Sequence, residues 1–256
     1  MLTYSGSASG SAGTIVLLHA FPVSGAMWEA QIPELEKDGF SVIAPNVYGF
    51  DGSPMRIEWN MADYAHDLAR LLDSLGVGKV SLAGLSMGGY QAFAFYRLYP
   101  ERVSSIVLCD TRANADAPEA QAQRMEFCRA IEAYGPTEAA SRMLPNFFAA
   151  RTYESNPGLV SKTREMILRQ PAPAISDAMK AIAGRVDSTD LLPEINFPVL
   201  IICGAEDRAT PPETAASMHS LIPGSRLEIL PEAGHLSNLD QPDLFNRLLL
   251  EHLKSL

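Results

Sequence analysis

The sequence predicts an α/β fold, with a mostly parallel sheet flanked by helices and one helical insertion. Three observations carry this prediction. Short apolar runs alternate with helical patterns at both ends of the chain, which is typical of strands joined by crossover helices. A Gly-x-Ser-x-Gly pentapeptide separates one such run from a helical pattern. Strand patterning then disappears between Thr111 and Leu192, where prolines interrupt several short helical patterns.

The expected elements follow in order along the chain. Leucines at helical spacing predict a helix that ends at Gly76, and the helix over 91–99 is stopped by Pro100. A last helix is expected over 242–254. Between these helices, apolar runs predict strands near 14–18, 41–44, 79–84, 103–109, 198–203 and 226–230.

Composition and charge narrow the classes of partner. The net charge of −10 argues against binding to nucleic acid or to an anionic membrane. No apolar run approaches the roughly 18 residues of a membrane helix, and residues 1–13 are small and polar, unlike a signal peptide. The three cysteines, Cys109, Cys128 and Cys203, lack metal-ligand spacing and are expected to be reduced thiols. We therefore expect a cytoplasmic protein, and a homodimer is compatible with the sequence.

The pentapeptide Gly84-Leu85-Ser86-Met87-Gly88 predicts a nucleophile. It follows the apolar run 79–83 and opens a helical pattern. A serine at a tight strand-to-helix turn is presented to its surroundings, and the close backbone approach in such a turn requires glycine on either side. Gly89 adds a further small residue where the helix would cross the strand. Ser86 is therefore the expected nucleophile.

A carboxylate and a histidine follow Ser86 in the order that accompanies such a turn. Asp207 comes just after the apolar run 198–203, and His235 follows the expected strand 226–230. Asp207 is the preferred acid, although it could instead cap the next helix. Two alternatives stay open: Asp110, which directly follows the strand pattern 103–109, and Glu206, the neighbour of Asp207.

With these motifs in place, the chain resembles the α/β-hydrolase family over essentially its whole length. The loop His19-Ala20-Phe21-Pro22 resembles the family's His-Gly-x loop. The resemblance implies an oxyanion hole formed by the backbone N–H groups of Phe21 and Met87, with His19 fixing the loop. Alanine stands at position 20 where glycine is usual, and it would be strained there if the loop required a positive φ.

The resemblance also implies a division of the chain into an α/β-hydrolase core, residues 1–110 and 193–256, and a helical cap, residues 111–192. In this family the cap covers the active site and shapes the substrate pocket. Phe127, Phe147 and Phe148 are candidates for lining that pocket, and packing between cap helices is the alternative for each. Arginines could receive a substrate carboxylate or simply face solvent; they are Arg112, Arg124 and Arg129.

The expected function is a serine hydrolase of small-molecule carboxylic esters or lactones, without a metal or an organic cofactor. Cys109-Asp110-Thr111 and Pro118-Glu119 resemble the 3-oxoadipate enol-lactone hydrolase branch. Alternatives with the same three residues are a carbon–carbon bond hydrolase, a perhydrolase and a ligand-sensing receptor. A dehalogenase is disfavoured because position 86 is serine rather than aspartate. Of the other histidines, His66 and His252 are expected to face solvent from amphipathic helices.

Overall fold

A computed structural model describes all 256 residues, and a seven-stranded sheet in the order β1-β3-β2-β4-β5-β6-β7 forms its centre. β1 is antiparallel to β3, and all other pairs are parallel. The strands are β1 (Tyr4–Ser5), β2 (Thr14–Leu18), β3 (Ser41–Pro45), β4 (Val80–Leu85), β5 (Val103–Cys109), β6 (Val199–Gly204) and β7 (Arg226–Leu230). The six expected strands are confirmed to within one residue at each end. β1 lies outside the prediction because two residues in a Ser/Gly-rich segment carry no readable period.

The helices are α1 (Ile32–Lys37), α2 (Met61–Ser74), α3 (Met87–Leu98), α4 (Pro118–Tyr134), α5 (Pro136–Met143), α6 (Ala150–Ser155), α7 (Pro157–Leu168), α8 (Ala172–Ala183), α9 (Pro212–Leu221), α10 (Ser237–Asp240) and α11 (Pro242–Lys254). Several begin at proline, whose fixed φ suits the first helical position and whose missing N–H costs nothing there. Most of the prolines that interrupt the helical pattern after Thr111 therefore mark helix starts. α3 begins at Met87, four residues earlier than expected.

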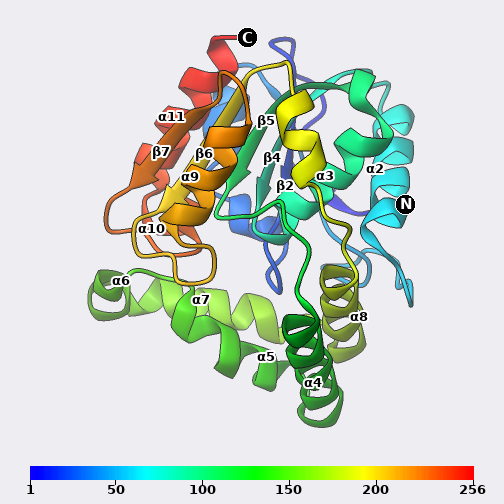
Figure 1. Cartoon of the computed structure of the whole chain (residues 1–256), viewed down its shortest axis with the longest axis vertical. Helices are drawn as coiled ribbons and strands as arrows, with labels where there is room; N and C mark the ends of the chain where they lie inside the picture. Colours follow the sequence, from blue (N-terminus) through cyan, green and yellow to red (C-terminus); the bar gives the residue numbers. More distant parts are fainter.

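Helices cover both faces of the sheet. α2, α3 and α9 lie in front of it in Figure 1, and α11 lies behind. β2, β3 and β4 are buried along nearly their whole length, as expected for parallel strands with helices on both sides. Behind the sheet, the ring of Phe245 on α11 lies 6.0 Å from that of Trp28. None of the helices combines the length and hydropathy needed to cross a membrane.

The prediction for His252 is wrong. This side chain is buried on α11, and burial lowers its pKa to about 4. It follows Leu248 and Leu249 by four and three residues, so it shares their inward face. His66 is exposed on α2, and its Nδ1 lies 2.7 Å from the Tyr99 hydroxyl.

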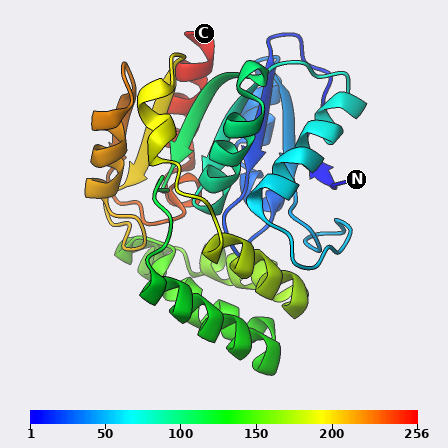
Figure 2. The ribbon, with the colours of Figure 1, turned by 45° about the vertical axis from the view of Figure 1, so that its right-hand side comes forward.

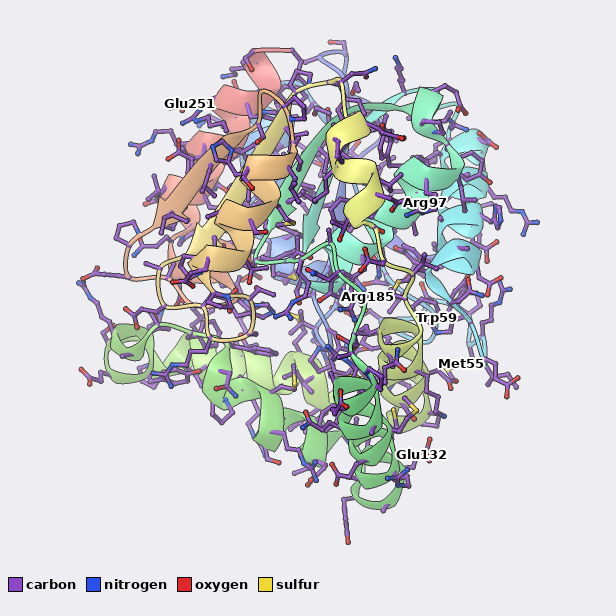
Figure 3. All side chains as sticks on the ribbon, viewed as in Figure 1. Met55, Trp59, Arg97, Glu132, Arg185 and Glu251 are labelled. Atoms are coloured by element: carbon purple, nitrogen blue, oxygen red, sulfur yellow. The ribbon has the colours of Figure 1, made fainter.

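Helices α4 to α8, which we call the helical layer, lie between β5 and β6 in the chain. They form a layer of their own beyond the carboxyl ends of the strands, and α4 runs beside α8 (Figures 1 and 2). Arg185 lies at the junction of this layer with the core (Figure 3). Its guanidinium stacks over the Tyr90 ring of α3 at 4.3 Å and donates to Asp116 Oδ1 at 2.8 Å. Both connections to the helical layer are thereby joined to α3.

Candidate active site

Ser86 occupies the turn between β4 and α3 in a conformation that few non-glycine residues adopt, with φ 55° and ψ −110°. Two hydrogen bonds hold its backbone. The Ser86 N–H donates to the Cys109 carbonyl at 2.9 Å, and the Thr111 hydroxyl donates to the Ser86 carbonyl at 2.8 Å. The strained residue is therefore fixed by the last residue of β5 and by Thr111, two residues further on, so that its hydroxyl is presented at the start of α3.

The predicted need for glycine around Ser86 is confirmed by the backbone packing. A Cβ on Gly84 would lie 2.3 Å from the Gly88 carbonyl oxygen, and one on Gly88 would lie 2.1 Å from the Leu18 carbonyl oxygen. On Gly89 it would lie 2.3 Å from the Thr111 hydroxyl oxygen. These separations are far below van der Waals contact, so no side chain fits at these positions.

Ser86, His235 and Asp207 form one chain of hydrogen bonds. His235 Nε2 lies 2.8 Å from Ser86 Oγ, and His235 Nδ1 lies 2.9 Å from Asp207 Oδ2. His235 comes from the loop after β7 and Asp207 from the loop after β6. Each of these two residues is only 3% exposed. The structure thus brings together the three side chains that the sequence singled out.

The loop around Asp207 supports the charged carboxylate. Oδ1 accepts from the backbone N–H of Ala209 at 2.8 Å and of Thr210 at 3.0 Å, and Oδ2 accepts from the Thr210 hydroxyl. Burial alone would raise the pKa of Asp207, but His235 and the bonds from Thr210 together lower it below its usual value. Asp207 therefore carries its negative charge at neutral pH.

The imidazole of His235 is more basic than a free histidine. Burial opposes its charged form, but the charge and hydrogen bond of Asp207 raise the pKa of His235 above 6.5, and Asp110 adds to this effect when it is ionised. The guanidinium of Arg112 acts in the opposite direction. An imidazole held in this way can accept a proton from Ser86 Oγ and stabilise the imidazolium that results.

The two alternative acids occupy different places. Asp110 is buried at the end of β5 and forms no hydrogen bond with His235; its carboxylate accepts from Gly204 N–H at 2.8 Å and from the Ser237 hydroxyl. Glu206 is exposed and accepts from the Ala150 N–H of α6 at 2.9 Å. Neither takes the place of Asp207 on His235 Nδ1.

The predicted oxyanion donors lie on the two segments that flank Ser86. Met87 is the first residue of α3, so its N–H has no acceptor within the helix. The buried Phe21 also leaves its N–H without an acceptor in the protein. His19 fixes this loop: Val47 N–H donates to Nε2 at 3.1 Å, and Nδ1 lies 2.9 Å from the Ala20 carbonyl. Ala20 is not among the residues with positive φ, so alanine is unstrained there.

The three candidate pocket aromatics differ in position. The Phe147 ring stacks on His235 with centroids 6.3 Å apart, and the Phe127 ring meets the edge of Phe21 at 6.3 Å. Phe148 instead packs against Tyr153 within the helical layer. Phe147 and Phe127 therefore contact residues of the candidate site, whereas Phe148 contacts a neighbour in its own layer.

The candidate arginines are also distinguished by their contacts. Arg124 forms an ion pair with Asp116, and Arg129 is exposed. Arg112 is half-buried and donates to the Ala209 carbonyl, in the loop that carries Asp207. The charge of Arg112 also acts on His235, where it lowers the pKa of the imidazole.

Two residues that support the site lie outside the sequence prediction. The Thr210 hydroxyl bonds Asp207 and lies 3.4 Å from His235 Nδ1. Asp240 accepts from Gly234 N–H at 2.7 Å and Ala149 N–H at 2.9 Å, and so joins the His235 loop to the helical layer. A hydroxyl three residues after an aspartate is a turn signal that could have indicated Thr210. No local pattern indicates Asp240.

The sheet order, the strained serine turn and the hydrogen-bonded side chains define an α/β hydrolase. Residues 13–242 match the family described as alpha/beta hydrolase fold, and the protein belongs to this family.

Similar proteins include several named hydrolases. A thermophilic esterase from Thermogutta terrifontis, solved with malate bound, is 39% identical, with a TM-score of 0.95 over 99% of this chain and 93% of that one. 3-Oxoadipate enol-lactonase 1 of Acinetobacter baylyi is 26% identical over 96% of this chain and 90% of its own length. A 2-hydroxy-6-oxononadienedioate/2-hydroxy-6-oxononatrienedioate hydrolase of Burkholderia vietnamiensis is 26% identical over 94% and 86%, respectively. The predicted resemblance to enol-lactone hydrolases is thus confirmed as a similarity.

Proposed function

We propose that the protein is a serine hydrolase that cleaves carboxylic esters or lactones through an acyl-enzyme. The observation that carries the proposal is the chain of hydrogen bonds from Ser86 through His235 to Asp207, at a strained turn after a parallel strand. The similarity to an esterase at 39% identity and to an enol-lactonase at 26% supports the same class of substrate.

In the first half of the reaction, Ser86 Oγ attacks the carbonyl carbon while His235 Nε2 takes the hydroxyl proton. Asp207 keeps the other ring proton on Nδ1, so that Nε2 is free to accept. The Phe21 and Met87 N–H groups donate to the oxyanion of the tetrahedral intermediate. The intermediate then collapses: the C–O bond to the leaving alkoxide breaks, and the His235 imidazolium protonates that oxygen.

In the second half, a water molecule replaces the alcohol. His235 Nε2 takes a proton from the water as its oxygen attacks the acyl carbon. Collapse of the second intermediate breaks the bond to Ser86 Oγ, which recovers its proton from His235. The products are a carboxylic acid and a free serine. For a lactone, the leaving alcohol remains part of the same molecule.

The helical layer is the proposed cap, within residues 111–192, and the core is formed by 1–110 and 193–256. Phe147 stacks on His235, and Phe127 contacts Phe21, so both adjoin the proposed catalytic groups. Large apolar side chains at such positions select substrates by shape. We propose that these two residues line the acyl or alcohol pocket and that Phe148 supports the cap from within.

A carbon–carbon bond hydrolase is the second candidate, because one relative is named a 2-hydroxy-6-oxononadienedioate hydrolase. The same serine and histidine would serve that reaction. Turnover of simple esters and lactones, measured beside that of a 2-hydroxy-6-oxo-dienoate, discriminates between the two. A receptor would give no sustained turnover of either.

A fluorophosphonate probe tests the proposed nucleophile. We expect the wild-type protein to gain the mass of one phosphonyl group and Ser86→Ala to gain none, since the probe reacts with an activated serine. Intact-mass spectrometry measures the adduct, and peptide mapping locates it. The Ser105→Ala variant is the matched control, because Ser105 is buried in β5 away from the turn and should not affect labelling. Equal labelling of wild type and Ser86→Ala would contradict the proposal.

Substrate selection tests the proposed cap. We expect Phe147→Ala to change the ratio of kcat/KM for a bulky ester to that for a short ester by about tenfold, in the range for altered pocket contacts. Phe148→Ala is the control and should change the ratio less, because its ring packs on Tyr153. Steady-state kinetics with the two esters measure the ratios. An equal loss on both esters in both variants would assign these rings to structural packing.

A further inference from the structure

Asp110 is a buried carboxyl group for which the proposed reaction has no step. It is 1% exposed and follows β5 with φ 45°. Oδ1 accepts from the Gly204 N–H at the end of β6, and the Ser237 hydroxyl donates to Oδ2. Ser237 begins α10, two residues after His235. Asp110 therefore bridges the end of β6 to the segment that carries His235.

Asp110 also lies close to the other buried carboxyl group of the site. One oxygen of Asp110, one oxygen of Asp207 and Cys203 Sγ all lie within 4.8 Å of one another. Two like charges this close in a buried site repel strongly, so that one carboxyl group keeps its proton. Asp207 has two backbone N–H donors, a hydroxyl donor and His235, whereas Asp110 has one N–H and one hydroxyl. The weaker set of donors makes Asp110 the protonated member.

The other titratable groups around Asp110 do not alter this assignment. The thiols of Cys109 and Cys203 have pKa values raised by burial, so they are neutral. His235 favours an ionised Asp110 only when the imidazole is protonated, and that charge acts on Asp207 as well. The guanidinium of Arg112 bonds the Ala209 carbonyl instead of Asp110.

We propose that Asp110 carries a proton at neutral pH and is a positioning residue that holds the His235 loop through Ser237. In this state its hydroxyl can donate to Ser237 Oγ while its carbonyl oxygen accepts from Gly204. Asp207 is then the single negative charge beside His235. The protonation is independent of the catalytic role, whereas the positioning of His235 rests on the proposed function.

The protonation has a consequence for stability. Burial, and then the charge of Asp207, raise the pKa of Asp110 to about 8, against the effects of His235 and the two hydrogen bonds. Because this value lies above that of an unfolded aspartate, about 4, the folded state binds the proton more tightly. Asp110 therefore stabilises the fold fully below about pH 4, and this contribution is lost progressively until about pH 8.

Urea unfolding across about pH 5 to 9 tests the protonation through the variant Asp110→Asn. The amide cannot ionise, so the stability of the variant relative to wild type should rise between about pH 5 and 8 and then level off. Asp116→Asn is the control. Burial opposes the charge of Asp116, but its bonds to Arg185 and Arg124 lower its pKa, so it is ionised throughout this range. The free energy of unfolding of this variant should therefore differ from that of wild type by a constant amount. If the free energies of unfolding of Asp110→Asn and wild type differed by the same amount at every pH, the proposal would be overturned. If that variant does not fold, infrared spectra of the wild type decide: absence of a protonated-carboxyl band at pH 7 contradicts it.

Kinetics test the positioning role. Asp110→Ala should lower kcat by about 10²-fold, since it removes both bonds and lets the His235 loop shift. Asp110→Asn should restore kcat to within about tenfold of wild type, because its oxygen can accept from Gly204 and its NH₂ can donate to Ser237. Equal losses in the two variants would overturn the positioning role. A wild type without turnover would instead contradict the proposed function and leave the unfolding result standing.

Discussion

Replacement of Asp207 by asparagine is expected to lower kcat for an activated ester by about 10⁴-fold. Asp207 Oδ1 accepts from two backbone N–H groups, so the amide oxygen of asparagine will take that position. The amide NH₂ then faces His235 Nδ1, which must become an acceptor. The remaining ring proton moves to Nε2, where it points at Ser86 and prevents the imidazole from accepting the serine proton.

The isosteric variant Asp110→Asn is the matched control for this experiment, since the two carboxyl groups lie in the same buried site. It should lose no more than about tenfold, because each of its hydrogen bonds can be retained. Circular dichroism and the unfolding transition establish that both variants are folded. A larger loss of kcat in Asp110→Asn than in Asp207→Asn would show that Asp110, at the end of β5, is the carboxylate that acts with His235.

The three residues of the site could be predicted from the sequence because each lies shortly after a strand with a strong apolar pattern. The carboxyl ends of parallel strands meet at one edge of the sheet, so Ser86, Asp207 and His235 are expected near one another. The glycines around Ser86 could be interpreted in the same way, since a close backbone approach requires glycine at fixed positions near the serine. The family resemblance adds the oxyanion loop, which residue pattern alone does not indicate.

The sequence does not decide in the same way whether Asp207 or Asp110 bonds to His235. Both follow buried strands, and what distinguishes them is the set of donors around each carboxyl group in three dimensions. Asp207 is followed by a turn that directs two N–H groups at it, whereas Asp110 meets Gly204 and Ser237 from distant parts of the chain. Asp240 depends on its contacts with the helical layer, far away in the sequence. Contacts between residues so far apart in the chain produce no local sequence pattern from which they could be predicted.

Prolines and packing explain the remaining differences. The prolines between α4 and α8 interrupt the helical pattern as expected, and the structure places most of them at helix starts. The charged neighbours of His252 favour a solvent-facing position, yet its spacing from Leu248 and Leu249 puts it on the buried face of α11. Helical period is the better guide there, because the direction of a side chain is set by its position on the helix.

Introduction of a single methyl group at Gly88 is expected to disable the site. In Gly88→Ala the new Cβ would lie 2.1 Å from the Leu18 carbonyl oxygen, so α3 and the end of β2 must separate. That movement displaces Met87 N–H on one side and, three residues beyond Leu18, Phe21 N–H on the other. Loss of one oxyanion donor costs about 10²–10³-fold in kcat, and we expect a loss of at least this size here.

The same substitution should lower the free energy of unfolding by about 1–3 kcal/mol, as for other overpacked interiors. This would occur although alanine is the better helix former by about 1 kcal/mol. Gly78→Ala is the matched control: no heavy atom lies within 4 Å of the position that its new Cβ would take, and its φ is not left-handed. It should leave kcat unchanged and alter the free energy of unfolding by no more than about 0.5 kcal/mol. Steady-state kinetics and urea unfolding of both variants make the comparison. Full activity in Gly88→Ala, together with the expected loss of stability, would contradict the assignment of the oxyanion donors to Phe21 and Met87.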